Sequence, residues 1–163
     1  MELIVFIAVA VVAIAAALVV LLHRNPVIGA LFLVTNLLCV AVLYLLLNAM
    51  FLAAIQVIVY AGAIMVLILF VIMLLNLRRE AEGVRAGLMQ MALASAAATM
   101  FLLLVAKAVA GLPGECAALP RGFGTAEYVG HLLFGEFFYP FEAISLVLLA
   151  AMAGANVLAK RRL

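Results

Sequence analysis

The sequence predicts an all-α integral membrane protein with five transmembrane helices. Hydrophobic residues make up 72% of the 163 positions and charged residues only 10%, against about 25% charged residues in a typical soluble domain. A chain of this length leaves roughly 30% of its surface exposed even when well packed, so this apolar excess must face lipid. Five apolar runs are each long enough to cross a bilayer as a helix, which takes about 20 residues.

The first three spans follow one another closely. We expect helices at residues 3–22, 27–47 and 50–75. The polar cluster from His23 to Pro26 ends the first helix and starts the second, because proline is tolerated only where a helix begins. The first span lacks a basic leading region and a polar cleavage stretch, so we expect it to be retained rather than removed as a signal peptide.

The second half of the chain adds two spans and a long connection. A charged loop from Asn76 to Arg85 precedes a helix expected at residues 88–110, where Ser95 and Thr99 can pack or hydrogen-bond between helices. Residues 111–139 are rich in glycine and proline and form the expected extracytoplasmic loop. Its aromatic part, 128–138, predicts a short element at the membrane interface. The last helix is expected at 141–159, after Pro140, which completes a single membrane domain over residues 1–163.

Basic residues are distributed unequally between the two sides that five spans create. Lys107 and Arg121 fall on one side. The other side receives Arg24, Arg78, Arg79, Arg85, Lys160, Arg161 and Arg162. Because cytoplasmic segments carry the excess of Lys and Arg, we expect the N-terminus outside and the C-terminus in the cytoplasm. Four or six spans would scatter these charges over both faces, so the bias also favours five.

Several function classes are disfavoured by composition. A net charge of +2, without a basic stripe among aromatic residues, gives no reason to expect a nucleic-acid partner. Cys39 and Cys116 form neither a disulfide framework nor a CxxC motif, and His23 and His131 have no ligand-type neighbours at metal-binding spacing. No GxGxxG turn is present. We therefore expect no metal, no cofactor and no catalytic residue on this chain.

Ionisable side chains are nearly absent from the predicted spans. Lys107 lies near a helix end, where its stem can extend to the interface. Glu142 lies within a turn of Pro140, and we interpret it as a solvated carboxylate at a helix start. A self-sufficient proton or ion carrier usually places such groups inside its spans. This shortage argues against independent ion transport.

The third span carries an unusual set of small and polar residues. Gln56 and Tyr60 are four positions apart and so share a helix face, which Ala63 continues. Ala61, Gly62 and Ala63 allow another backbone to approach closely, and the glycine lowers the cost of departing from regular helix geometry. Physical reasoning leaves two interpretations, a packing groove with two hydrogen-bonding groups or a functional hinge.

This span also resembles a known family. The stretch VYAGAIMVL at residues 59–67, continued by FVIMLLN at residues 70–76, resembles the third-helix signature of the small J subunit of proton-pumping NADH:quinone oxidoreductase, respiratory complex I. The mitochondrial counterpart is ND subunit six. Asn25-Pro26 at the start of the second helix also matches. The likeness is specific from about residue 23 to residue 77 and otherwise rests on length and helix layout.

The resemblance implies a π-bulge in the third helix, an extra residue in one turn that often marks a functional site. In this family, switching that turn between π and α geometry is proposed to open or close a water path from the quinone end of the complex to its membrane pumps. Mapped here, the gating residues are Tyr60, Ala61, Gly62, Ala63, Met65, Val66 and Leu67. Gly62 would be the compliant point and Tyr60 the polar group that moves or holds water. Gln56, which is glutamate in some members, cannot ionise and so cannot itself carry the proton.

The resemblance further implies a non-catalytic subunit in the membrane arm of complex I, located in the bacterial inner membrane. Its partners would be the other membrane subunits and the lipid bilayer, with quinone affecting it only indirectly. NADH, FMN, iron–sulfur clusters and quinone would be bound by other subunits. The chain would help couple quinone reduction to proton translocation.

Two alternatives stay open at this point. A stand-alone small transporter or channel would move protons or substrate as the purified chain in liposomes. A structural or assembly protein would be required for the complex, but substitution of Gly62 or Tyr60 would leave pumping unchanged.

Overall fold

The computed structural model describes residues 1–75, 88–111 and 120–160, and its secondary structure in these ranges is helical. The charged loop predicted from Asn76 to Arg85, together with Cys116, Arg161 and Arg162, lies outside the described residues. Residue contacts divide the chain into two units. One unit contains α1 to α4, α6 and α7, and the other contains α5.

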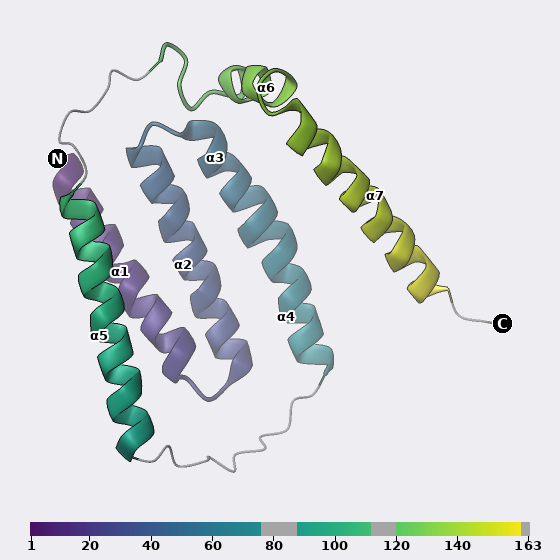
Figure 1. The fold of residues 1–163 in the computed structure, drawn as a ribbon. Coiled ribbons are helices and arrows are strands. Elements are labelled where there is room, and N and C mark those ends of the chain that lie inside the picture. The colour runs from purple at the N-terminus through teal and green to yellow at the C-terminus, as the bar shows by residue number, and fades with distance from the viewer. Residues whose placement is uncertain (76–87, 112–119, 161–163) are drawn as a thin grey trace. The chain divides into compact units, whose positions relative to one another are not determined.

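Within the described ranges, five helical segments are long and apolar enough to cross a membrane, which confirms the predicted all-α fold with five transmembrane helices. The helices are drawn in Figure 1. Two spans are the uninterrupted helices α1 (Glu2–Leu22) and α2 (Pro26–Leu46). The third span is a continuous run of α3 (Met50–Ile55), the π-helix η1 (Gln56–Ile64) and α4 (Met65–Leu74). The remaining spans are α5 (Leu88–Ala110) and α7 (Phe138–Ala159), and the short helix α6 (Ala126–Phe134) precedes α7.

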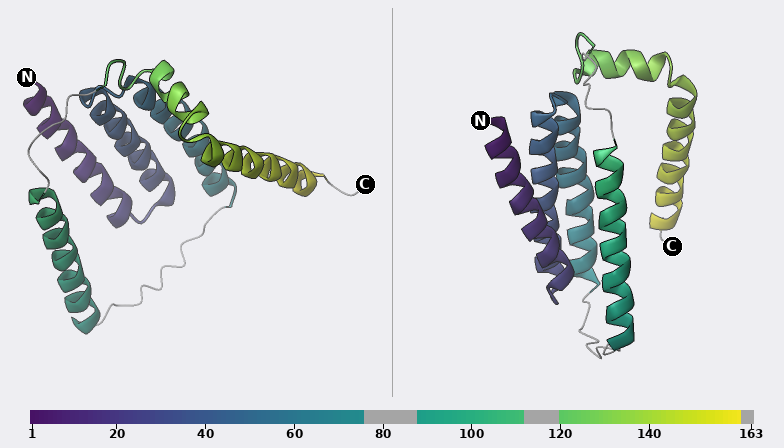
Figure 2. Two further views of the ribbon diagram at one scale, coloured as in Figure 1. Left: turned by 45° about the horizontal axis from the view of Figure 1, so that its top comes forward. Right: turned by 60° about the vertical axis from the view of Figure 1, so that its left-hand side comes forward.

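The helices α1, α2 and the third span lie side by side, as the two views in Figure 2 show. Small residues make this packing possible: the buried apolar residues of α1 and α2 are Ala16, Gly29, Ala30 and Ala41. A Cβ atom at Gly29 would already lie 3.7 Å from the carbonyl oxygen of Val20, so the two backbones approach closely. The Asn36 side chain donates a hydrogen bond of 3.0 Å to the carbonyl oxygen of Ala13. Close packing and interhelical hydrogen bonds are what hold helices together in lipid.

Helix α2 begins where the sequence predicts. The side chain of Asn25 accepts a hydrogen bond of 3.0 Å from the backbone N–H of Val27, and Pro26 occupies the first helical position. Such a cap satisfies one of the donors that a helix start leaves without a partner. The turn from α2 to α3 is short, with Asn48 in the left-handed region at φ 58°.

The segment before the last span differs from the expected boundaries. The short element begins at Ala126 and ends at Phe134, and the last span begins at Phe138 rather than after Pro140. Pro140 therefore lies in the first turn of α7, where a backbone N–H has no partner within the helix and its loss costs nothing. The rings of Phe134 and Phe141 meet edge to face with centroids 5.1 Å apart, joining the end of α6 to the start of α7.

Helix α5, in its own unit, uses its small polar residues internally. The hydroxyl of Ser95 donates to the carbonyl of Ala92 at 3.0 Å, and that of Thr99 donates to Ser95 at 2.8 Å. These bonds satisfy the hydroxyl donors without a second helix.

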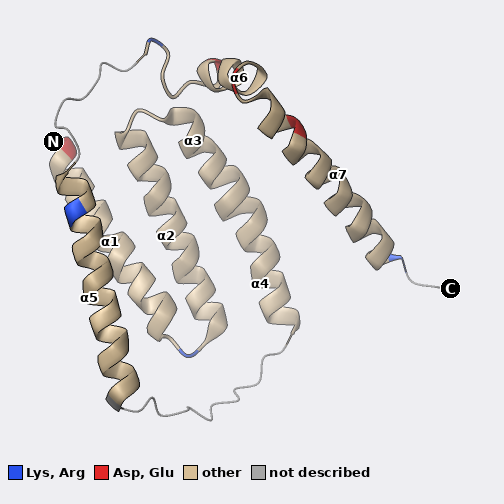
Figure 3. Cartoon of the chain, viewed as in Figure 1, with Lys and Arg blue, Asp and Glu red and all other residues tan. Residues whose placement is uncertain are grey.

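Charged positions among the described residues lie near helix ends or in the connections between helices, as the colours in Figure 3 show. Most large apolar side chains of the spans are exposed, and none of the described residues of α7 is buried. A surface of this kind needs lipid or other membrane helices against it.

Candidate functional site

The candidate site is the π-helical segment η1, Gln56–Ile64, in the middle of the third span. The N–H of Met65 donates to the carbonyl of Tyr60, five residues earlier, as π geometry requires. At the other end, the N–H of Gln56 is shared between the carbonyls of Leu52 and Ala53. The α-helical turns on both sides are regular, so the departure from α geometry is local.

The π-helical turns change which residues face α2. In α3 the buried residue Ala53 follows the buried Ala49 of the preceding turn by four positions, as in a regular helix, and Gln56 follows three positions later. The next buried residue of the span is Met65, nine positions after Gln56. Nine residues of a regular α-helix make about two and a half turns and would place Met65 on the opposite side. Turns closed by bonds five residues apart take roughly one residue more each, so nine residues complete about two turns.

This shift corrects the face expected from α-helical spacing. Ala63 does not continue the face of Gln56, because it is exposed in η1, and Met65 takes that place with 2% of its surface exposed. Tyr60 is 49% exposed, whereas Gln56 is 8% exposed. The face predicted from Gln56, Tyr60 and Ala63 is therefore buried only at Gln56.

The other predicted gating residues are divided between η1 and α4. Ala61 and Gly62 lie in η1, with Ala61 half-buried and Gly62 exposed. Val66 and Leu67 belong to α4 with Met65, and both are exposed. Val66 lines an apolar groove of about 290 Å³ together with Val27, Leu69, Phe70 and Met73.

Gly62 is closely confined by its own backbone. A Cβ atom there would lie 3.3 Å from the carbonyl oxygen of Val57, five residues earlier. That distance is shorter than ordinary van der Waals contact, so a side chain at this position requires the wide turn to shift by a few tenths of an ångström. In contrast, a Cβ atom at Gly154 of α7 would meet nothing within 4 Å beyond the neighbouring turns of its own helix.

The polar content of the site consists of Gln56 and Tyr60. Residues 50–75 include no Asp, Glu, Lys, Arg or His. Among the described residues, the side-chain amide of Gln56 forms no hydrogen bond, and its atoms are not fully enclosed by the chain. Because a polar group within a membrane is costly without a partner, this amide is suited to bind water or a group from a neighbouring protein.

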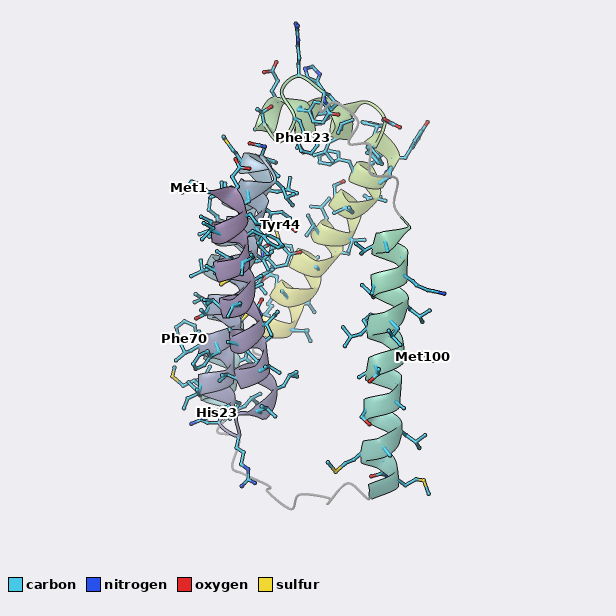
Figure 4. The ribbon with its side chains drawn as sticks, turned by 90° about the vertical axis from the view of Figure 1, so that its left-hand side faces the viewer. Met1, His23, Tyr44, Phe70, Met100 and Phe123 are labelled. Carbon is cyan, nitrogen blue, oxygen red and sulfur yellow. The ribbon has the colours of Figure 1, made fainter. Side chains whose placement is uncertain are left out.

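One further contact of the third span was not predicted from the sequence. The backbone N–H of Phe51 donates a hydrogen bond of 2.9 Å to the carbonyl oxygen of Gly124, which is buried. Figure 4 shows Phe123 at this end of the molecule and His23 at the opposite end. The only signal in the sequence is the pair of nearby glycines, Gly122 and Gly124, which indicates a turn but not the partner of that turn.

Comparison with known proteins finds similarity along most of the chain. The family described as NADH-ubiquinone/plastoquinone oxidoreductase chain 6 matches residues 16–158. The NAD(P)H-quinone oxidoreductase subunit 6 of the organellar chromatophore of Paulinella chromatophora is 42% identical, over 99% of this chain and 80% of its own length. The NADH-quinone oxidoreductase subunit J of Rhodobacter capsulatus is 36% identical, over 93% and 78%. The F(420)H(2) dehydrogenase subunit J of Methanosarcina mazei is 41% identical, over 88% and 82%.

Proposed function

Because the chain belongs to the chain 6 family of NADH-ubiquinone/plastoquinone oxidoreductases, we propose that it helps couple quinone reduction to proton translocation by gating a water path at its third span. The observation that carries this proposal is the π-helical segment η1, which brings Gln56 and Met65 to one face. Rewinding η1 to α geometry would turn Met65 away from that face and bring Ala63 toward it. A bulky side chain and a small one would thereby exchange places beside the amide of Gln56.

This exchange suits a gate because it changes volume and leaves charge unchanged. Met65 fills space beside α2 in the π state, and Ala63 would leave that space open to water in the α state. The amide of Gln56 can donate and accept hydrogen bonds to such water. The span has no Asp, Glu, Lys, Arg or His, so the protons themselves would be bound by neighbouring subunits.

The names of the relatives support a role that is independent of the electron donor. These names specify NAD(P)H, NADH and F(420)H(2) as the substrates of the respective enzymes. A chain shared by enzymes with different donors fits a part that is remote from donor oxidation. We therefore propose that it acts without redox chemistry of its own, in the membrane arm of an energy-converting oxidoreductase. We propose the bacterial inner membrane as its setting, since the five spans require a membrane.

The test is Gly62→Val, compared with Gly154→Val as a matched control in another span. A branched side chain at Gly62 would press on the carbonyl of Val57 and disfavour the π turn, whereas at Gly154 no atom beyond the neighbouring turns of its own helix lies within 4 Å of the added Cβ. Each ~1.4 kcal/mol of such strain would shift the balance between π and α states about tenfold. We expect Gly62→Val to lower quinone-coupled proton translocation several-fold at unchanged abundance of the complex. If proton translocation and the amount of assembled complex fell equally, the site would serve helix packing and not gating.

A further inference from the structure

We infer that Gly124 is a positioning residue that holds the N-terminal end of the third span and so fixes one side of η1. This inference rests on the gating function proposed above. Gly124 has φ +77°, in the left-handed region, and it is buried. A Cβ atom built on it would overlap the carbonyl oxygen of Asn48 and lie 2.8 Å from the Cα atom of Ala49. The turn that contains Gly124 is thus in direct contact with the turn between α2 and α3, and we call this contact the seat.

The seat is reinforced by a hydrogen bond that the third span needs. Phe51 is the second residue of α3, and its N–H has no partner within the helix because the first four N–H groups of any helix lack one. The carbonyl oxygen of Gly124 accepts this N–H at 2.9 Å. A second bond, from the N–H of Ala49 to the carbonyl of Tyr44 at 2.9 Å, tightens the same turn.

The seat also fixes the start of α6. Thr125 directly follows Gly124, and its side chain accepts a hydrogen bond of 3.3 Å from the N–H of Tyr128 while donating one of 2.7 Å to the carbonyl of Gly122. The rings of Phe123 and Tyr128 lie with centroids 6.0 Å apart. One turn of chain therefore caps α6 and the third span together.

The two halves of the third span are consequently held to different degrees. The N-terminal half is held by the hydrogen bond between Phe51 and Gly124 and by three buried residues, Ala49, Ala53 and Gln56. In α4 only Met65 is buried, and Leu67, Phe70 and Met73 are each more than half exposed. A change of turn geometry in η1 must rotate one half against the other, and the seated half resists. The rotation would then fall on α4.

Amide hydrogen exchange of the assembled complex tests the seat without any substitution. We expect the amide of Phe51 to exchange at least tenfold more slowly than that of Met50, which forms no such bond outside its helix among the described residues. Equal, fast exchange of both amides would overturn the inference. This measurement does not depend on whether gating occurs.

The matched variants are Gly124→Ala and Gly122→Ala. Both glycines have a positive φ, +77° and +79°, so alanine strains the backbone equally at each. Only Gly124 lacks space, since a Cβ at Gly122 meets nothing closer than the hydroxyl of Thr125 at 3.7 Å. We expect Gly124→Ala to abolish the protection of the Phe51 amide and to lower the ratio of protons translocated to electrons transferred, while Gly122→Ala changes neither.

The outcomes separate this inference from the function on which it rests. Lost protection of Phe51 with an unchanged proton-to-electron ratio would overturn Gly124 as a positioning residue, and so would identical behaviour of the two variants. If Gly62→Val also left the ratio unchanged, the gating function would fail as well. If the proton-to-electron ratio fell in Gly62→Val but not in Gly124→Ala, the gating function would stand and the positioning role of Gly124 would be overturned.

Discussion

Gln56 and Met65 are nine residues apart in one continuous helical span, yet both are buried on the side that contacts α2. A regular α-helix would place them on opposite sides. The π-helical turns between them bring them into line, so the burial of Met65 depends on the geometry of η1. The stability of that geometry and the packing of Met65 are two aspects of the same arrangement.

Replacement of Met65 by alanine should therefore weaken the π state. The methionine side chain packs against α2 only while η1 keeps its wide turns, and alanine removes most of that contact. We expect Met65→Ala to slow quinone-coupled proton translocation several-fold, as Gly62→Val does. Met73→Ala is the control, because Met73 is 63% exposed. Comparable losses from both methionine variants would show that the packing of Met65 has no special role.

The Gln56 amide is expected to contribute through hydrogen bonding rather than through packing. Gln56→Leu keeps a side chain of similar size and removes both the donor and the acceptor. We expect the abundance of the complex to stay within a factor of about two, because the Gln56 amide forms no hydrogen bond among the described residues and an apolar side chain of similar size leaves no polar group unpaired. The rate of proton translocation should fall further than the rate of quinone reduction. A variant with normal translocation would exclude Gln56 from the water path.

Much of the fold could be predicted because the membrane imposes strong constraints on the sequence. A span needs about 20 apolar residues, and Asn25 and Pro26 mark one boundary by their own chemistry. The start of α7 was predicted too late, because Pro140 suggested a boundary although proline is tolerated throughout the first turn. In each case the information was local to a few residues.

Two features could not be derived from local sequence: which residues of the third span are buried, and the contact between Gly124 and the turn from α2 to α3. The positions of Gln56, Tyr60 and Ala63 match an α-helical face, and nothing in their spacing indicates turns closed five residues apart. The resemblance implied an irregular turn around residues 60–67, and the π-helix of the structure occupies Gln56–Ile64. Gly124 meets Asn48 across 76 positions of chain, a contact that depends on the assembled fold.

Tyr60 offers a test of the polar group on the open side of η1. Its side chain is 49% exposed in this chain, so its hydroxyl can reach water or a neighbouring subunit. Tyr60→Phe removes only that hydroxyl and keeps the ring. We expect a lower rate of coupled proton translocation, by about tenfold if one hydrogen bond of ~1.4 kcal/mol is lost in the conducting state. An unaltered rate and an unaltered proton-to-electron ratio would exclude Tyr60 from the gate.

The basic residues predict the sidedness of the chain, and this prediction can be measured directly. Lys160 follows the last span and Arg24 lies between α1 and α2, on the side expected to be cytoplasmic. Arg121 lies in the connection whose Gly124 contacts the turn between α2 and α3, as expected if both are on the other side. A reporter enzyme that is active only outside the cytoplasm should therefore work when fused after Arg121 and fail when fused after Lys160. The reverse pattern would show that the orientation is opposite to the one predicted. With five spans, one crossing separates Arg121 from Lys160. Reporter activity at both positions would therefore contradict five spans, because it requires an even number of crossings between them.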